Sequence, residues 1–194
     1  MINVIYEDQH AFLWVGTSGY CLSRRDPANG RFDHYSYVEG ERPPETRGMN
    51  QIRRFYQDID DTRGLGTMGG LIRFDQRLED LTYYRHDPAD AATLGHDQVN
   101  DIYRDRAGDL WLATGAGLDR YDPLADAFNH FTEENGLPNN MILGILEDDE
   151  GRLWLSINGG LSRYDPALDA IRNYDTSDGL QSLEFNSGAR FQNQ

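Results

Sequence analysis

One phrase returns four times along this chain, and the repetition constrains the fold more than any other feature of the sequence. The last copy shows it most fully, as the segments 145–154 (ILEDDEGRLW) and 159–166 (GGLSRYDP). The second copy is degenerate and keeps little more than 66–67 and 70–75. The Asp residues that end the copies lie at positions 26, 75, 122 and 165, so the copies are 49, 47 and 43 residues apart. Such a period indicates an array of similar small units.

Each copy predicts four short strands, A to D. In the third copy these are 99–105, 110–114, 118–121 and 127–131, and glycines or an Asp-Pro pair separate them. No segment carries an apolar stripe of helical period, which excludes a solenoid of helix pairs. Since a four-stranded antiparallel unit cannot bury both faces alone, the sequence predicts an all-β fold of β-propeller blades stacked around a channel. The predicted blades are 1–35, 49–85, 99–131 and 141–174, with 183–192 as the first strand of a fifth.

The second blade departs from the pattern. Aligning Asp58 with Asp8 places Gly64 where the first blade has Trp14. A buried Trp is then missing from strand B, a loss that costs about 3–5 kcal/mol where the site cannot collapse. Residues 49–85 are therefore predicted to form the least stable blade.

The repeats resemble the two-component regulator propeller, and the resemblance covers nearly the whole chain. It rests on the Asp-x-x-Gly-x-Leu-Trp and Gly-Leu-x-Arg-(Tyr/Phe)-Asp-Pro phrases and on the linkers 84–88 (YRHDP) and 135–138 (NGLP). The closing segment 178–189 resembles the passage that leads into the last blade in this family.

This resemblance implies the extracytoplasmic, periplasmic sensor region of a bacterial two-component receptor. Such receptors usually carry a signal peptide, many repeats, a small β-sandwich, a transmembrane helix and a cytoplasmic histidine kinase or diguanylate cyclase. We therefore expect a fragment of about four blades, whose partners include the remaining blades of the parent receptor. No positively charged leader precedes an apolar region at Met1, so we expect that export is not encoded within this segment.

Charge limits the partners of the chain. The formal net charge is −15 and Lys is absent, which argues against nucleic acid or an anionic membrane, since phosphate contacts need clustered Lys and Arg. No apolar run is long enough to cross a membrane, so we expect no membrane contact by this segment. The single cysteine, Cys21, cannot form an internal disulfide and is expected to pack in strand C of the first blade.

Several motifs imitate catalytic or metal-binding chemistry. Segment 149–154 resembles the Asp-box turn of sialidases, in which we expect Asp149 to bind the amides of its own turn. Segment 66–70 lacks the Lys and the helix of a phosphate loop, and 58–61 lacks the Gly and distal Glu of a calcium loop. No pair of carboxylates stands out for glycoside hydrolysis. We expect no metal or cofactor, because metal-ligand spacing is absent among the histidines His10, His34, His86, His96 and His130.

One arginine recurs at the same place in every strand C. These residues are Arg24, Arg73, Arg120 and Arg163. A half-buried guanidinium needs partners, so each is expected to meet an Asp or backbone carbonyls and to serve structure.

Ligand contacts are expected instead from residues that differ among blades. In a propeller the D-to-A connections and B-to-C turns gather on one rim, and function usually resides in such loops. Asn, Tyr, Arg and His suit hydroxyl-rich ligands such as oligosaccharides, although any one Asn is equally explained by support of a turn. The turns also supply Met68 and Ala116, and the candidate binding residues are Tyr20, Arg47, Asn50, His96, Asn100, Asn139, Asn140 and Asn158.

The sequence favours a non-catalytic ligand-sensing segment over two alternatives, a propeller scaffold for protein contacts and a propeller hydrolase or lyase. A ligand that signals must prefer one arrangement of the propeller and its following domain. Four blades taken from a larger propeller would expose the apolar faces of the first and last blades, so we also expect a homodimer joined head to tail.

Overall fold

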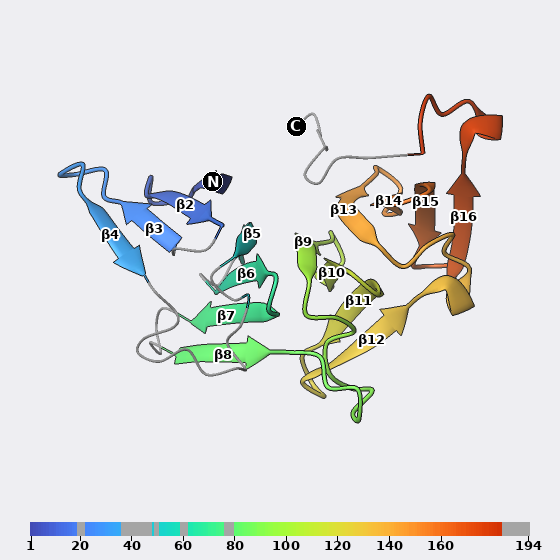
Figure 1. Cartoon of the computed structure of the whole chain (residues 1–194), viewed down its shortest axis with the longest axis horizontal. Helices are drawn as coiled ribbons and strands as arrows, with labels where there is room; N and C mark the ends of the chain where they lie inside the picture. Colours follow the sequence, from blue (N-terminus) through green and yellow to red (C-terminus); the bar gives the residue numbers. More distant parts are fainter. Residues whose placement is uncertain (19–21, 36–47, 49–50, 59–61, 76–79, 184–194) are drawn as a thin grey trace. The chain divides into compact units, whose positions relative to one another are not determined.

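The structure is a computed structural model, and it describes residues 1–18, 22–35, 48, 51–58, 62–75 and 80–183. These residues form four sheets of four antiparallel strands, each in the order A, B, C, D (Figure 1). The strands are β1 (Ile2–Glu7), β2 (Leu13–Thr17), β3 (Leu22–Arg25) and β4 (Phe32–Tyr35) in blade 1; β5 (Ile52–Gln57), β6 (Arg63–Thr67), β7 (Leu71–Asp75) and β8 (Asp80–Tyr84) in blade 2; β9 (Val99–Arg104), β10 (Leu110–Thr114), β11 (Gly117–Asp122) and β12 (Ala127–Phe131) in blade 3; β13 (Ile142–Glu147), β14 (Leu153–Ile157), β15 (Gly160–Asp165) and β16 (Ala170–Tyr174) in blade 4. The predicted all-β fold of four-stranded blades is confirmed.

Two features lie outside the strand prediction. Single 3-10 turns occupy Glu133–Asn135 and Thr176–Asp178, and each ends at a glycine in the left-handed region, Gly136 and Gly179. The predicted strand at 183–192 lies outside the described residues except for Leu183. Cys21 is also outside them.

The chain divides into two compact units of two blades each. Unit 1 holds blades 1 and 2 and comprises residues 1–85 and 97–99, and unit 2 holds blades 3 and 4 and comprises 86–96 and 100–194. In unit 1, the core joins Ile52 and Phe55 of β5 to Trp14 and Leu22 of blade 1.

The core of unit 2 repeats this arrangement. Here Ile142 and Ile145 of β13 pack with Trp111 and Leu118 of blade 3. We name the face of a blade that packs on the preceding blade its front face, and the opposite face its back face. A front face thus carries two apolar residues from strand A, and a back face carries the Trp of strand B and a Leu of strand C.

Each complete blade closes its first hairpin with an Asp and a Trp. The Asp8 carboxylate accepts hydrogen bonds from the backbone N–H of His10 and Phe12 and, through Oδ2, from Trp14 Nε1 at 2.8 Å. Asp105 accepts Trp111 Nε1 at 2.7 Å in the same way. A hairpin and the buried indole beside it are therefore fixed by one carboxylate.

The sequence placed this role on the wrong residue in blade 4. Asp148, not Asp149, accepts the N–H groups of Glu150 and Arg152 and the Nε1 of Trp154. Burial opposes ionisation of Asp148, but the hydrogen bonds from Trp154 and from the backbone and side chain of Arg152 outweigh it and lower the pKa of Asp148. The reason is spacing, since the carboxylate must lie six residues before the Trp to reach the indole, as Asp8 and Asp105 do.

The recurring arginine lies opposite the Trp in the sheet register. The pairs are Trp14 with Arg24, Trp111 with Arg120, and Trp154 with Arg163. Each guanidinium lies over the indole ring, 5.7 to 5.8 Å from its centroid. The prediction of an Asp partner is confirmed for Arg24, which pairs with Asp33 at 3.0 Å, and for Arg120, which pairs with Asp109 at 2.8 Å.

The alignment of the degenerate blade is also confirmed. Gly64 pairs with Arg73 and with Tyr56, as Trp14 pairs with Arg24 and with Tyr6. The neighbouring Arg63 is buried, with its guanidinium 5.2 Å from the centre of the Trp14 ring in blade 1.

Candidate ligand-binding rim

The register of each sheet brings the D-to-A connection and the B-to-C turn to one edge. In blade 4, Ile142 at the start of β13 pairs with Ile157 at the end of β14. Tyr174 at the end of β16 pairs with Leu161 at the start of β15. The loops that open strand A, close strand D and join B to C therefore lie together, and we call this edge of a blade its rim.

The rim of blade 4 gathers three of the candidate residues. Asn158, which is exposed in the B-to-C turn, donates its backbone N–H to the carbonyl of Met141 at 3.0 Å. The N–H of Met141 in turn donates to Asn139 Oδ1 at 2.8 Å. Asn140 accepts the N–H of Glu133 through its own Oδ1 at 2.8 Å, which closes the connection on itself. Asn139 and Asn140 thus use one amide oxygen each to shape the loop.

The rim of blade 3 holds His96 against a glycine. A Cβ at Gly115 would lie 2.7 Å from His96 Nδ1, so only glycine allows the imidazole to pack on the B-to-C turn. Thr114 fixes that turn, since its hydroxyl donates to the carbonyl of Gly117 and accepts the N–H of Ala116. His96 and Ala116 are therefore neighbours on a rigid turn.

Asn100 has a different position. It is 4% exposed, and its Nδ2 donates to the carbonyl of Ile142 in the next blade at 2.7 Å. Asn3 makes the same contact with the carbonyl of Ile52 at 2.9 Å. Asn100 thus ties the inner strands of two blades together.

The remaining candidates belong to unit 1. Tyr20, Arg47 and Asn50 lie outside the described residues. Met68, in the turn of blade 2, donates its N–H to the carbonyl of Gln51, and its sulfur accepts Arg53 Nε at 2.8 Å. The rim of blade 2 is therefore organised like that of blade 4, with the B-to-C turn fastened to the residue before strand A.

A polar clasp that the sequence did not predict holds the connection to blade 3. Asp119, 1% exposed on β11, lies 2.7 Å from Nδ1 of His130 and accepts the N–H of Gly95 at 2.8 Å. His130 Nε2 lies 3.0 Å from the carbonyl oxygen of Ala91. The hydrogen bond to Asp119, opposed by burial, raises the pKa of His130. This clasp positions the loop that carries His96. One signal for this contact was available, because Asp119 of strand C pairs with His130 of strand D in the sheet.

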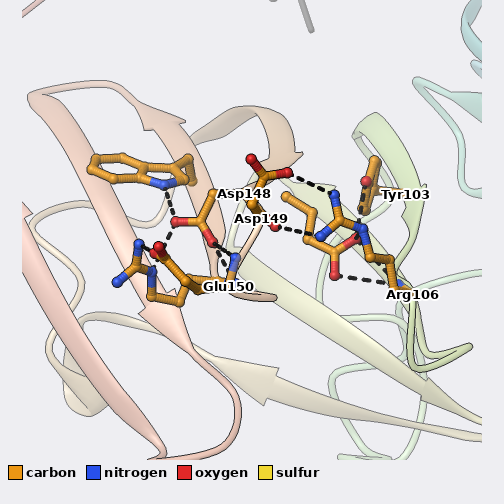
Figure 2. Close-up of polar contacts among 8 residues, drawn as sticks. Tyr103, Arg106, Asp148, Asp149 and Glu150 are labelled. Carbon is orange, nitrogen blue, oxygen red and sulfur yellow. Dashed lines mark hydrogen bonds and ion pairs between the residues drawn. The ribbon is translucent and has the colours of Figure 1, made fainter. Parts of the chain in front are cut away.

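The opposite edge of unit 2 carries a dense group of charges (Figure 2). Glu147, with a side chain 3% exposed, accepts the hydroxyl of Tyr103 at 3.2 Å and the N–H of Arg106. The Arg106 guanidinium donates hydrogen bonds to the Asp148 carbonyl and the Asp149 carboxylate. Burial, followed by the charge of Glu147, raises the pKa of Tyr103 to about 12. The group joins blade 3 to blade 4, which makes it a structural junction.

The described residues offer neither a metal-binding cluster nor a helix that could span a membrane. They contain no group of three or more His, Cys, Asp or Glu side chains placed to hold a metal ion. In the part of the chain that the structure describes, no helix is long and apolar enough to cross a membrane.

Residues 93–116 and 136–159 match the family model described as two component regulator propeller. The chain contains two component regulator propeller repeats. Each matched stretch runs from a D-to-A connection through strands A and B into a B-to-C turn, so the repeat includes the rim loops described above.

The propeller repeats have the same fold as several solved structures. The extracellular domain of the hybrid two component system BT3049 from B. thetaiotaomicron matches 89% of this chain with TM-score 0.77 and 22% identity, and the chain covers 24% of it. The extracellular domain of the one component system BT4673 from the same organism matches 95% with TM-score 0.76 and 24% identity, and the chain covers 26% of it.

A catalytically inactive form of virginiamycin B lyase from Staphylococcus aureus, with quinupristin, has TM-score 0.64, 14% identity and 93% coverage of this chain, which covers 56% of it. The chain spans about a quarter of the length of the two receptor domains. No curated protein matches the sequence.

Proposed function

We propose that this chain is a non-catalytic, extracytoplasmic ligand-sensing segment of a bacterial two-component receptor, and that its rim binds a small polar ligand such as an oligosaccharide. The observation that carries the proposal is the pairing of rigid turns with side chains that vary between blades. Blade 3 presents His96 beside Ala116, whereas blade 4 presents Asn158 beside Asn139. A repeat that keeps its framework and varies its rim is suited to selecting one ligand.

The donor set fits a hydroxyl-rich ligand. The amides of Asn139 and Asn158 offer both donors and acceptors, and an imidazole offers a planar ring besides its nitrogen atoms. Asn139 uses its Oδ1 to accept the Met141 N–H, and the same amide carries Nδ2 as a donor. The similarity in fold to extracellular domains of signalling systems supports the sensor proposal, and the chain's formal net charge of −15 is compatible with a neutral ligand.

The hydrolase or lyase alternative has one observation in its favour, the fold shared with virginiamycin B lyase. Fold alone does not assign chemistry. On the described rim of unit 2, the candidate residues contact backbone and turns and form no nucleophile and base pair. We therefore favour ligand binding over a scaffold function, and a scaffold function over catalysis.

A screen of neutral di- to hexasaccharides tests the proposal by thermal shift, followed by calorimetry of any hit. A ligand that binds the native state raises the unfolding temperature. We expect Asn158→Ala and His96→Ala each to weaken binding about 3- to 10-fold, the effect of one lost hydrogen bond. Asn129→Ala is the matched control, because Asn129 is exposed in the middle of β12, away from the rim.

Two results would reject the proposal. One is a hit whose affinity is unchanged by the two rim variants and reduced by the control. The other is turnover of the saccharide, followed by product chromatography, which would favour the hydrolase or lyase.

A further inference from the structure

One pair of facing residues on strands C and D holds the incoming connection in both blades of unit 2. In blade 4, Ser162 donates its hydroxyl to Asn173 Oδ1 at 2.6 Å, and Asn173 Nδ2 donates to the carbonyl of Gly136 at 2.8 Å. In blade 3 the same register position holds Asp119 and His130, the polar clasp described above. The pair thus has the same task in both blades, and it is neutral in blade 4 but ionisable in blade 3.

Both ring nitrogens of His130 face hydrogen-bond acceptors. Nδ1 lies 2.7 Å from Asp119 Oδ1, and Nε2 lies 3.0 Å from the carbonyl oxygen of Ala91. A neutral imidazole carries one N–H and can donate to one of these acceptors, whereas an imidazolium donates to both. The geometry of the clasp therefore fits the protonated ring, which also supplies a counter-charge for a carboxylate that is 1% exposed.

The backbone of the connection 86–96 lies directly on this pair. Gly95 donates its N–H to Asp119 Oδ2 at 2.8 Å, and a Cβ at Gly95 would lie 2.8 Å from Asp119 Oδ1. The N–H of Phe128, on the same strand as His130, donates to the carbonyl of Ala92 at 2.9 Å. The clasp therefore holds the segment that ends in the rim residue His96.

We propose that protonation of His130 closes the clasp on the connection 86–96, and that the clasp opens as the pH rises. Deprotonation leaves one N–H, which stays with the charged acceptor Asp119, so the Ala91 carbonyl then faces a lone pair of Nε2. From β11 the charged group that faces His130 is Asp119, and from the connection it is faced by the backbone of Ala91 and Thr93. The hydrogen bond to Asp119 is the main cause that raises the pKa of His130, so the opening lies above pH 6.5.

Hydrogen exchange of the connection 86–96 between about pH 5.5 and 8.5, corrected for the intrinsic pH dependence of exchange, tests the proposal. The connection 132–141, which the neutral pair holds, is the reference within the same chain. We expect the protection of 86–96 to fall about 3- to 5-fold over this range, the effect of one weakened hydrogen bond, while that of 132–141 stays constant. The chain is measured without ligand, so the result is separate from that of the proposed binding function.

Three variants assign the pH dependence to the clasp. His130→Asn, which copies the residue of blade 4, should give 86–96 a protection that no longer changes with pH. His34→Asn is the matched control, because His34 pairs with Ser23 at the same register position in blade 1 and should leave the pH dependence in place. Asp119→Ser keeps His130 and removes its charged partner, so the fall in protection should move to lower pH.

Circular dichroism checks that each variant is folded. Constant protection of 86–96 in the wild-type chain overturns the proposal. A pH dependence that survives in folded His130→Asn does so as well, because His86 or His96 of the same connection would then be its source. The proposal also fails if Asp119→Ser leaves the midpoint of the change where it is, or if the control variant loses the dependence.

Discussion

The junction between the two blades of each unit buries a charged side chain, and the sign of that charge differs between the two units. In unit 1 the second blade contributes a buried cation, Arg63, whose side chain is 4% exposed and whose Nη2 lies 3.8 Å from Asp8 Oδ2 in the first blade. In unit 2 the second blade contributes a buried anion, Glu147, which accepts Tyr103 of the first blade. The two charges stand at different positions of the repeat, because Glu147 aligns with Gln57 and Arg63 aligns with Leu153. Each junction therefore has its own polar pair at its own site.

The aromatic contacts follow the same division. Trp14 stacks on Phe55 with centroids 5.2 Å apart and planes at 25°, while Trp111 meets Tyr164 edge-on at 5.6 Å and 69°. The partner comes from strand A in one unit and from strand C in the other. A core that accepts both geometries depends on filled volume more than on one ring orientation.

The largest effect is expected from removing the indole of unit 2. Trp111 is 0% exposed and anchors both its hairpin and the junction, so Trp111→Ala should lower the free energy of unfolding by about 3–5 kcal/mol. Urea unfolding of the purified chain measures it. Leu124→Ala, which removes an exposed side chain, should change the stability little, and an equal loss in both variants would contradict the assignment.

In unit 1 a smaller effect is expected from removing the buried cation Arg63, which faces Asp8 and Trp14 of blade 1. Arg63→Met keeps the buried volume but removes the partner of Asp8, and breaking a buried pair usually costs about 3–5 kcal/mol. Asp8 still accepts three N–H groups, so we expect a loss nearer 2 kcal/mol. Hydrogen exchange of β5 to β7 measures it and also tests the predicted low stability of residues 49–85. Protection equal to that of blade 4 would count against that prediction.

Replacing Glu147 of unit 2 by glutamine, the residue at the equivalent position of unit 1, should weaken the junction between blades 3 and 4 by about 1–2 kcal/mol. Glu147→Gln copies Gln57, which accepts Tyr6 OH at 3.5 Å. In the wild type, Tyr103 has a pKa of about 12 in the folded state against 10.0 for the unfolded chain. Its contribution is complete below pH 10 and is lost as the pH rises from 10 to 12. Ultraviolet titration should show a lower Tyr103 pKa in the variant, and an unchanged value would rule out the Glu147 contact.

The smallest effect is expected at the clasp of blade 3. Because the pKa of His130 is raised above 6.5 in the folded state, its stabilisation is complete below pH 6.5 and is lost as the pH rises through the raised value. His130→Asn, which copies Asn173 of blade 4, should cost less than about 1 kcal/mol at pH 6 and less again at pH 8. NMR titration of the histidines checks the direction, and a His130 pKa below 6.5 would refute it.

The sequence predicted those parts of the fold that depend on the repeat. The four-stranded antiparallel blades and the vacant Trp position at Gly64 both follow from aligning equivalent residues of the copies. The sequence prediction for the hairpin carboxylate of blade 4 was wrong, because it named Asp149 in place of Asp148. The two acids are adjacent, and only Asp148 lies at the six-residue spacing that reaches the indole of Trp154.

The candidate site was less accessible to sequence reasoning. Asn100 and Asn139 are the same residue type near the start of a strand A, yet Asn100 lies within β9 and ties two blades, whereas Asn139 lies in the connection before β13 and shapes a rim. The Asp119–His130 clasp joins residues of neighbouring strands to a loop earlier in the chain, a contact that no local pattern specifies.

The paired 3-10 turns have a consequence for how such chains change in length. Gly136 and Gly179 lie 43 residues apart, and the turn before each satisfies its own backbone groups through a capping box. A segment cut at these two glycines would carry one whole blade with its connector and leave no turn half made. Gene duplication or deletion in steps of that segment would therefore preserve every hairpin, and would give lineages a way to alter the number of rim loops without redesigning a single blade.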